Sequence, residues 1–176
     1  AIVNTKDAAF NIFRGISDRL NALNYKQVQI QQGLSDEELK ECAKGCREDE
    51  ILSVHLSTLM CPKHRKEILR WIKAWLLGKK LVCCVSTALI EAGINVSFPI
   101  VVRSWAGIPS LIQAAGRCNR NCEEDTGRVY IWNLTEESLG PLPDIQKGKE
   151  FSMSLLRDVE NPDELGNPEM IKKYFA

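Results

Sequence analysis

The chain has 176 residues, a length that fits one globular domain able to bury most of its apolar surface. Its 23 basic and 23 acidic residues give a net charge of zero, so any contact with nucleic acid must come from local basic patches. No apolar run reaches the length of a membrane span. The seven cysteines, without a secretion signal, predict a reducing, cytoplasmic environment.

The hydropathy pattern predicts strands and helices that alternate along most of the chain. In the first half we expect strands at residues 25–30 and 51–56 and helices at 7–23, from Ser35, and from Pro62 to about Gly78. In the second half we expect strands at 81–85, 99–103 and 128–132, and short helices near 145–158 and 167–175. This alternation predicts an α/β fold, a parallel sheet with helices on both faces.

Two features of the first half have ordinary structural interpretations that we prefer. The helix from Pro62 carries an outer basic stripe, which we interpret as a solvated face rather than a DNA contact: Lys63, Lys66, Arg70 and Lys73. The pairs Cys42-x3-Cys46 and Cys61-x2-His64 could be arranged as a zinc site. We predict no metal site, because ligand-like spacing also arises by chance.

A polar motif follows the apolar strand at residues 81–85. The segment Ser86-Thr87-Ala88-Leu89-Ile90-Glu91-Ala92-Gly93-Ile94-Asn95-Val96 begins where that strand leaves the sheet. Open α/β sheets bind ligands outside the carboxyl ends of their strands. Thr87 is placed to cap a short helix whose free amides suit a phosphate. A capped helix without any ligand would have the same sequence, so this motif alone leaves both interpretations open.

The segment Gln113-Ala114-Ala115-Gly116-Arg117-Cys118-Asn119-Arg120 brings two arginines close together. If it is helical, one face carries four of its residues: Gln113, Gly116, Arg117 and Arg120. Guanidinium groups match phosphate oxygens bidentately, and the glycine lets a phosphate approach. A purely structural helix would gain nothing from that glycine, which costs about 1 kcal/mol relative to alanine. The spacing favours a polyphosphate clamp slightly over a solvated helix.

Together these two segments resemble motifs V and VI of superfamily 2 helicases. Ala1-Ile2-Val3-Asn4-Thr5-Lys6-Asp7-Ala8 is similar to the strand and turn of motif IV, and residues 56–65 are similar to the segment between motifs IV and V. Leu89-Ile90-Glu91-Ala92-Gly93, followed by the segment 113–120, is most similar to the CRISPR-associated helicase-nuclease of type I interference systems. The resemblance covers residues 1 to about 133.

The resemblance implies that residues 1–133 form the second RecA-like domain of a helicase core. It also implies that residues 134–176 are a linker and C-terminal helices leading towards a further domain. The sequence has no G-x-x-x-x-G-K-[ST] phosphate loop and no Asp-Glu-x-His pair for magnesium. We therefore expect ATP with Mg²⁺ to be held mainly by a first RecA-like domain. The full-length protein would be an ATP-dependent helicase, and this chain alone would be inactive.

For the nucleotide, the resemblance implies that Arg117 and Arg120 act as arginine fingers on the γ-phosphate. Gln113 would orient them or the attacking water. Gly93 and Gly116 would let backbone approach the nucleotide. Many relatives have Asp at the position of Asn95, where it meets the ribose, and Asn95 can still form hydrogen bonds without a charge.

For nucleic acid, the resemblance implies that Thr5 and Thr87 bind backbone phosphates, with Asn4, Ser57 and Arg103 nearby. Such contacts are independent of base sequence, as a translocating motor requires. Ordinary turn chemistry explains Asn4 and Ser57 equally well.

The implied partners are the first RecA-like domain and a nuclease domain of the same protein, single-stranded DNA and an RNA-guided CRISPR surveillance complex. We expect no membrane partner. Two alternatives remain. One is a superfamily 2 helicase of another pathway, acting on RNA or in restriction. The other is a catalytically silent RecA-like interaction module, which Asn95 and the missing phosphate loop favour and the intact arginine pair disfavours.

Overall fold

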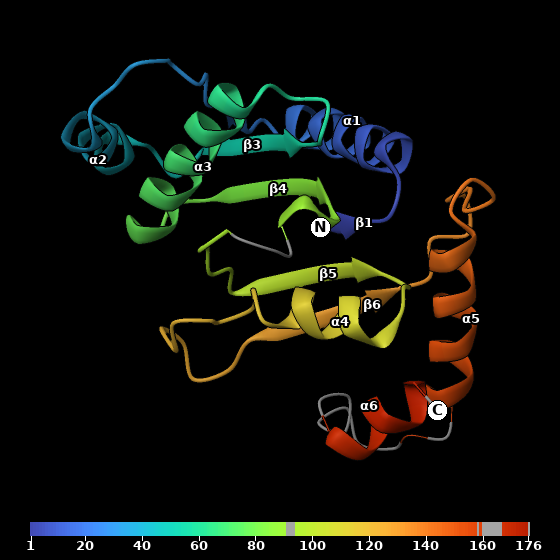
Figure 1. The fold of residues 1–176 in the computed structure, drawn as a ribbon. Helices are drawn as coiled ribbons and strands as arrows, with labels where there is room; N and C mark the ends of the chain where they lie inside the picture. The colour runs from blue at the N-terminus through green and yellow to red at the C-terminus, as the bar shows by residue number, and fades with distance from the viewer. Residues whose placement is uncertain (91–93, 158, 160–166, 176) are drawn as a thin grey trace.

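The computed structural model describes residues 1–90, 94–157, 159 and 167–175. Within these residues six parallel strands form one sheet in the order β2-β3-β4-β1-β5-β6 (Figure 1). The strands are β1 (Ile2–Val3), β2 (Lys26–Gln27), β3 (Glu50–Leu56), β4 (Val82–Thr87), β5 (Ile100–Ser104) and β6 (Arg128–Trp132). The predicted parallel α/β sheet is confirmed. The strand expected at residues 25–30 is much shorter, because only two of its residues pair with β3.

Helices cover both faces of this sheet. They are α1 (Lys6–Ala22), α2 (Asp36–Gly45), α3 (Pro62–Leu77), α4 (Ile108–Ala115), α5 (Pro143–Leu156) and α6 (Pro168–Phe175). A short 3-10 turn, η1 (Ala88–Ile90), follows β4. None of the helices in the described ranges is long and apolar enough to cross a bilayer.

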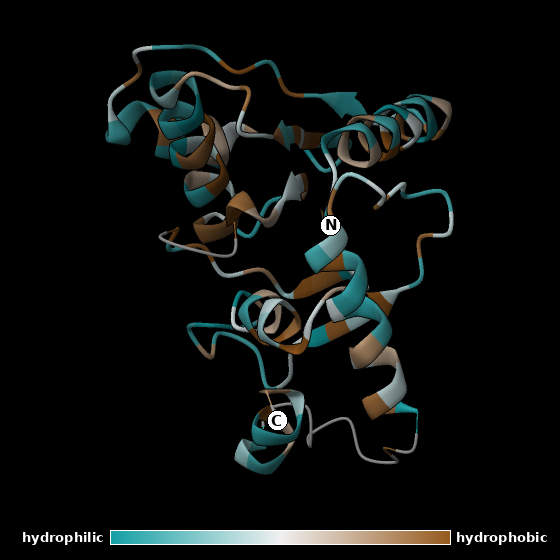
Figure 2. Cartoon of the chain, turned by 45° about the vertical axis from the view of Figure 1, so that its right-hand side comes forward, coloured by the Kyte–Doolittle hydropathy of each residue, from teal (hydrophilic) through white to brown (hydrophobic). Residues whose placement is uncertain are grey.

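Alternating side chains divide the core between the two faces. Ile2 and Cys84 belong to the cluster under α3 and α4, whereas their neighbours Val3 and Val85 pack against α1. Figure 2 shows hydrophobic and hydrophilic segments side by side within each helix, as expected for helices with one buried face. The two-residue periodicity of the central strands therefore places one helix layer on each side of the sheet.

The helix ends follow the local sequence. Ser35 accepts a hydrogen bond from the Glu38 amide at 3.2 Å, and the Glu38 carboxylate accepts one from the Ser35 amide at 2.7 Å, which completes the predicted capping box of α2. This second bond lowers the pKa of Glu38. α3 has Pro62 in its first turn and ends at Gly78, as predicted.

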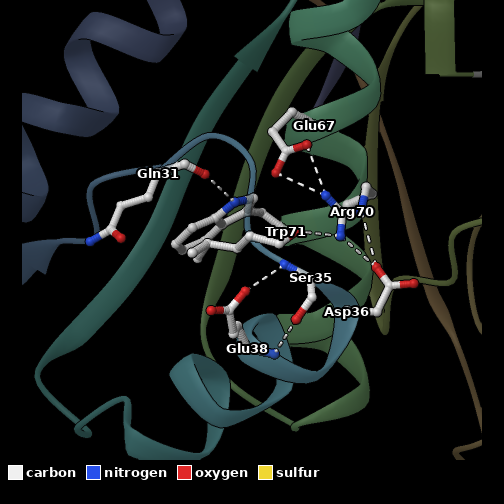
Figure 3. Close-up of polar contacts among 8 residues, drawn as sticks. Gln31, Ser35, Asp36, Glu38, Glu67, Arg70 and Trp71 are labelled. Carbon is white, nitrogen blue, oxygen red and sulfur yellow. Dashed lines mark hydrogen bonds and ion pairs between the residues drawn. The ribbon is translucent and has the colours of Figure 1, made fainter.

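Two tryptophans anchor α3 in the core. The rings of Trp71 and Trp75 stack with their centroids 4.8 Å apart, and both side chains are almost fully buried. The Trp71 indole nitrogen donates a hydrogen bond to the Gln31 carbonyl at 3.1 Å (Figure 3), so its one polar atom stays paired inside the core. Burying a large apolar side chain contributes roughly 1.5–3 kcal/mol to the free energy of folding.

Arg70 links α3 to the start of α2 and is not the solvated side chain that the basic stripe predicted. Its guanidinium donates to the Asp36 carboxylate at 2.7 Å, to the Leu34 carbonyl at 2.7 Å and to Glu67 at 3.0 Å (Figure 3). The hydrogen bond from Arg70 lowers the pKa of Asp36. The stripe expectation is therefore wrong at Arg70, whereas Lys63, Lys66 and Lys73 are exposed.

The C-terminal helices pack on α4. A Cβ built on Gly107 at the start of α4 would meet the Tyr174 hydroxyl of α6, and a Cβ built on Gly148 of α5 would lie 2.9 Å from the same oxygen. The rings of Phe151 and Tyr174 also contact each other, with centroids 5.5 Å apart. α5 and α6 are thus joined to the helix that precedes the arginine pair, and the boundary at residue 133 stays a prediction.

The capping box gives a test of this local structure. Ser35→Ala removes the acceptor of the Glu38 amide and should lower the free energy of unfolding by about 1 kcal/mol, the usual cost of losing an N-cap. Urea unfolding of residues 1–176 measures it. Ser154→Ala, at an exposed position in the last turn of α5, is the matched control and should cause no loss because alanine favours helices. Equal stability of Ser35→Ala and the wild-type chain would contradict the assignment.

Candidate functional site

The predicted nucleic-acid residues lie along one edge of the sheet. Ser57 directly follows β3, Thr87 ends β4, Asn4 and Thr5 follow β1, and Arg103 lies one residue before the end of β5. These four strands are neighbours and run parallel, so their carboxyl ends share an edge. The fold therefore brings together five residues that are up to 99 positions apart in the sequence. This edge is where open α/β sheets bind ligands.

Asn4 is the centre of a hydrogen-bond cluster at this edge. Its Nδ2 donates to Ser104 Oγ at 3.0 Å, to the Trp105 carbonyl at 2.9 Å and to Glu137 Oε2 at 2.8 Å. Its Oδ1 accepts a hydrogen bond from Arg103 at 2.8 Å. The Asn4 side chain thus connects β1 to the end of β5 and to the segment after β6, which is far more than the turn chemistry considered for it from sequence.

Arg103 lies inside the domain, behind the other residues of this edge. This residue is 2% exposed, and its guanidinium donates to Asn4 and to both the carbonyl and the hydroxyl of Ser104. A buried guanidinium needs such partners to offset its lost hydration. Arg103 therefore positions Asn4 from inside the domain, and a part for it in nucleic-acid binding stays a prediction. Ser57 and Thr87 are also largely covered, at 3% and 7% exposed.

Sequence analysis missed Glu137 at this edge. Glu137 Oε1 accepts hydrogen bonds from the main-chain amides of Asn4 at 2.6 Å and Thr5 at 2.9 Å. Thr5 caps α1 by accepting the Ala8 amide at 3.2 Å. Glu137 lies in an irregular segment with no periodicity or motif, so no sequence signal connects it to residue 4. The two residues come together only when the strands of the sheet pair.

A cavity of about 510 Å³ adjoins these amides. One wall comes from the start of α1 and the other from the segment after β6; its lining includes Asn4, Thr5, Lys6, Asp7, Leu134, Glu136, Ser138 and Leu142. This cavity thus lies beside Asn4 and Thr5, between α1 and residues 134–142.

The arginine pair lies at the opposite edge of the sheet, and not on one helical face as expected. α4 ends at Ala115, Gly116 is its C-cap, and Asn119 has a positive φ of 45°. The cause is an isolated parallel bridge between Phe98 and Cys118, in which the Phe98 amide donates to the Arg117 carbonyl at 2.9 Å. Sheet-like pairing beside the amino end of β5 therefore replaces the last helical turn.

Cys118 and Gly127 hold the turn that carries the arginines. The Cys118 thiol lies 3.4 Å from the Pro99 carbonyl and 3.3 Å from the Arg128 carbonyl, and burial raises its pKa. A Cβ on Gly127 would lie only 2.7 Å from the Cys118 sulfur, so glycine is needed there. The turn is thereby fixed against β5 and β6, with Arg117 half-buried and Arg120 exposed.

The other predicted nucleotide residues are placed as follows. Gln113 is exposed in the last turn of α4, and Gly116 is exposed at its end. Asn95 is exposed and borders a pocket of about 190 Å³ with Ser97 and Asn121. Gly93 lies outside the described residues. Among the described residues, Asn95 and Asn121 thus line one pocket near the arginine turn.

Among the described residues no three His, Cys, Asp or Glu side chains gather as metal ligands. The chemistry at the arginine edge suits the oxygens of a polyphosphate rather than its metal ion, because guanidiniums and amides are hydrogen-bond donors.

Comparisons with known proteins agree with this architecture. A family model described as "CRISPR-associated nuclease/helicase Cas3, C-terminal" matches residues 2–123. The CRISPR-associated nuclease/helicase Cas3 of Haloferax volcanii is 44% identical over 54 residues, which is 30% of this chain and 6% of that protein.

Solved structures of T. fusca Cas3 have the same fold. The ADP form aligns over 99% of this chain and 20% of the solved one, with a TM-score of 0.65 at 15% identity. The AMPPNP form covers 99% and 19%, with a TM-score of 0.62 at 16% identity. The chain thus spans about a fifth of the solved relatives. On the family match over most of its length, the chain belongs to the family of the C-terminal helicase region of Cas3.

Proposed function

We propose that this chain is the C-terminal half of an ATP-dependent DNA helicase or translocase acting in CRISPR interference. In this proposal it supplies arginine fingers and part of the path of single-stranded DNA. One observation carries it: the two predicted sets of residues lie at opposite edges of one parallel sheet, within the residues that the Cas3 family model matches. A motor needs this separation, because nucleotide and nucleic acid must bind at the same time.

The arginine turn is the part of the chain suited to ATP. Arg120 is exposed on a turn fixed by Cys118, so it can reach an anion held by another domain without first being ordered. In the proposal Arg120 and Arg117 stabilise the charge that develops on the γ-phosphate. ATP with Mg²⁺ supplies the phosphoryl group, and the first RecA-like domain holds the metal.

The remaining nucleotide residues have supporting roles in this proposal. Gln113, in the last turn of α4, orients the attacking water or the guanidiniums. Asn95 donates hydrogen bonds towards the ribose, and the backbone at Gly93 and Gly116 borders the nucleotide. The exposed positions of Gln113 and Asn95 support these assignments.

The carboxyl edge is the part of the chain suited to a nucleic-acid backbone. Asn4, Thr5, Ser57 and Thr87 are neutral hydrogen-bond donors, which bind phosphates without reading bases. The buried Arg103 contributes positive charge behind them and orients Asn4. The proposed partners are single-stranded DNA, the first RecA-like and nuclease domains of the same protein, and an RNA-guided surveillance complex; the nuclease/helicase name of the relatives supports them.

The half-site proposal predicts that residues 1–176 alone do not hydrolyse ATP detectably and bind it weakly. The reason is that the sequence has no phosphate loop to hold the β- and γ-phosphates. Calorimetry and a phosphate-release assay measure both quantities. Submillimolar affinity, or turnover above a buffer control, would show that this chain carries a nucleotide site of its own.

The arginine proposal is tested in the full-length protein. Arg120→Ala should reduce DNA-stimulated ATPase activity by roughly 10³-fold, the scale of losing an arginine finger. Arg117→Ala should do the same, but it needs a check of folding because Arg117 is half-buried. Arg19→Ala, on the exposed surface of α1, removes the same charge and should leave activity unchanged. Arg120→Ala activity within a few-fold of wild type would end the finger assignment.

The DNA path is tested with Thr87 and the basic stripe. Thr87→Val in the full-length protein should weaken binding of single-stranded DNA by about 1 kcal/mol, the net worth of one hydrogen bond, and equally for all base sequences. Lys66→Ala, on the exposed face of α3, should change affinity little. Fluorescence anisotropy with labelled oligonucleotides at two salt concentrations measures both. The opposite result would place the DNA path on α3: a large loss of affinity and a weaker salt dependence of binding for Lys66→Ala, with the affinity of Thr87→Val unchanged.

A further inference from the structure

The carboxylate of Glu137 occupies the hydrogen-bond donors that the proposed function assigns to a phosphate. Oε1 accepts the amides of Asn4 and Thr5 at 2.6 and 2.9 Å, and Oε2 accepts Asn4 Nδ2 at 2.8 Å. These donors stand at the amino end of α1, where the helix dipole favours a negative group. A phosphate oxygen would use the same three donors, so a carboxylate and a phosphate cannot both be bound there.

The donors keep their orientation without Glu137. Arg103 fixes Asn4 Oδ1 at 2.8 Å, and the Ser104 hydroxyl and the Trp105 carbonyl accept from Asn4 Nδ2. Thr5 is held separately as the cap of α1. The site is therefore built by β1, α1 and β5, and Glu137 is an anion bound to it from a segment more than 130 residues later in the chain.

The surroundings leave space for a larger anion once that segment moves. Residues 134–142 form one wall of the 510 Å³ cavity whose other wall carries Asn4, Thr5 and Lys6. The charged groups that face this space are Lys6, Asp7 and Glu136. With Glu137 in place the amide donors are used by a carboxylate, and with Glu137 withdrawn they open towards this cavity beside a lysine.

We propose that Glu137 is an internal competitor of the nucleic-acid backbone. A phosphodiester of single-stranded DNA displaces the Glu137 carboxylate from the Asn4 and Thr5 amides, and the segment 134–142 moves away as it binds. This inference rests on the proposed function, in which Asn4 and Thr5 contact DNA. Its consequence is that occupation of the DNA path changes the position of the segment leading to α5.

The test compares two neighbouring glutamates in the full-length protein by anisotropy with a labelled single-stranded oligonucleotide. Glu137→Ala should tighten binding about tenfold, because DNA no longer has to break charge-assisted hydrogen bonds. Glu137→Asp keeps the charge but shortens the side chain, and it should also tighten binding severalfold. Glu136→Ala removes the same charge from the neighbouring side chain, which lines the cavity, but leaves the hydrogen bonds of Glu137 in place, so it should tighten binding far less than Glu137→Ala.

A second measurement on the wild-type protein does not depend on any substitution. Adding the oligonucleotide should speed amide hydrogen exchange in residues 134–142, because DNA releases the segment. Unchanged exchange, or equal tightening by Glu136→Ala and Glu137→Ala, would overturn the proposal that Glu137 competes with DNA. If the wild-type protein still binds the oligonucleotide, the proposed function stands in either case. Absence of oligonucleotide binding by the wild type and by both Glu137 variants would instead overturn the proposed function itself.

Discussion

The rest of this domain depends on the pairing of the two-residue strand β1 with both of its neighbours. Ile2 pairs with Ser86 of β4 on one side and with Arg103 of β5 on the other, so β1 joins β2-β3-β4 to β5-β6 (Figure 1). The Ala1 amino group donates to the Cys84 carbonyl, and the Ser86 amide donates back to the Ala1 carbonyl. Without these contacts the two parts would not share an edge, and Asn4 could not meet Ser104.

This arrangement gives the two edges different chemistry. The carboxyl edge carries neutral donors backed by a buried guanidinium, whereas the amino edge carries an exposed arginine on a rigid turn. In the proposed function, the neutral donors would bind a phosphodiester of DNA without reading its bases. In the same proposal, the exposed guanidinium of Arg120 would form bidentate hydrogen bonds with phosphate oxygens delivered by another domain.

Much of the fold could be predicted from local sequence. The cap at Ser35, the proline at the start of α3, the glycine at its end and the bounds of β6 are set by neighbouring residues, and the predicted positions agree with the structure. Other features depend on pairing between residues that are distant in the sequence. The segment 113–120, considered as a helix from its spacing, is helical only to Ala115 because Phe98 pairs with Cys118. The bonds of Arg103 to Asn4 inside the sheet likewise join residues 99 positions apart.

The candidate site could be predicted only in part for the same reason. Motif resemblance identified Asn4 and Thr5, since those residues lie within a short, recognisable segment. Glu137 contacts both of them, yet its own neighbours in the sequence show no periodicity. A residue whose role depends on a partner more than 130 positions away is found from the fold and not from a local pattern.

The contact of Tyr174 with Gly107 and Gly148 has a consequence for sequence variation. A methyl group at either glycine would meet the tyrosine hydroxyl, so alanine at either position requires the Tyr174 side chain to shift. Loss of the ring would remove that restriction on both glycines together. Across homologous chains we therefore expect these three positions to vary as a group, although they belong to three different helix regions and are separated by up to 67 residues in the sequence.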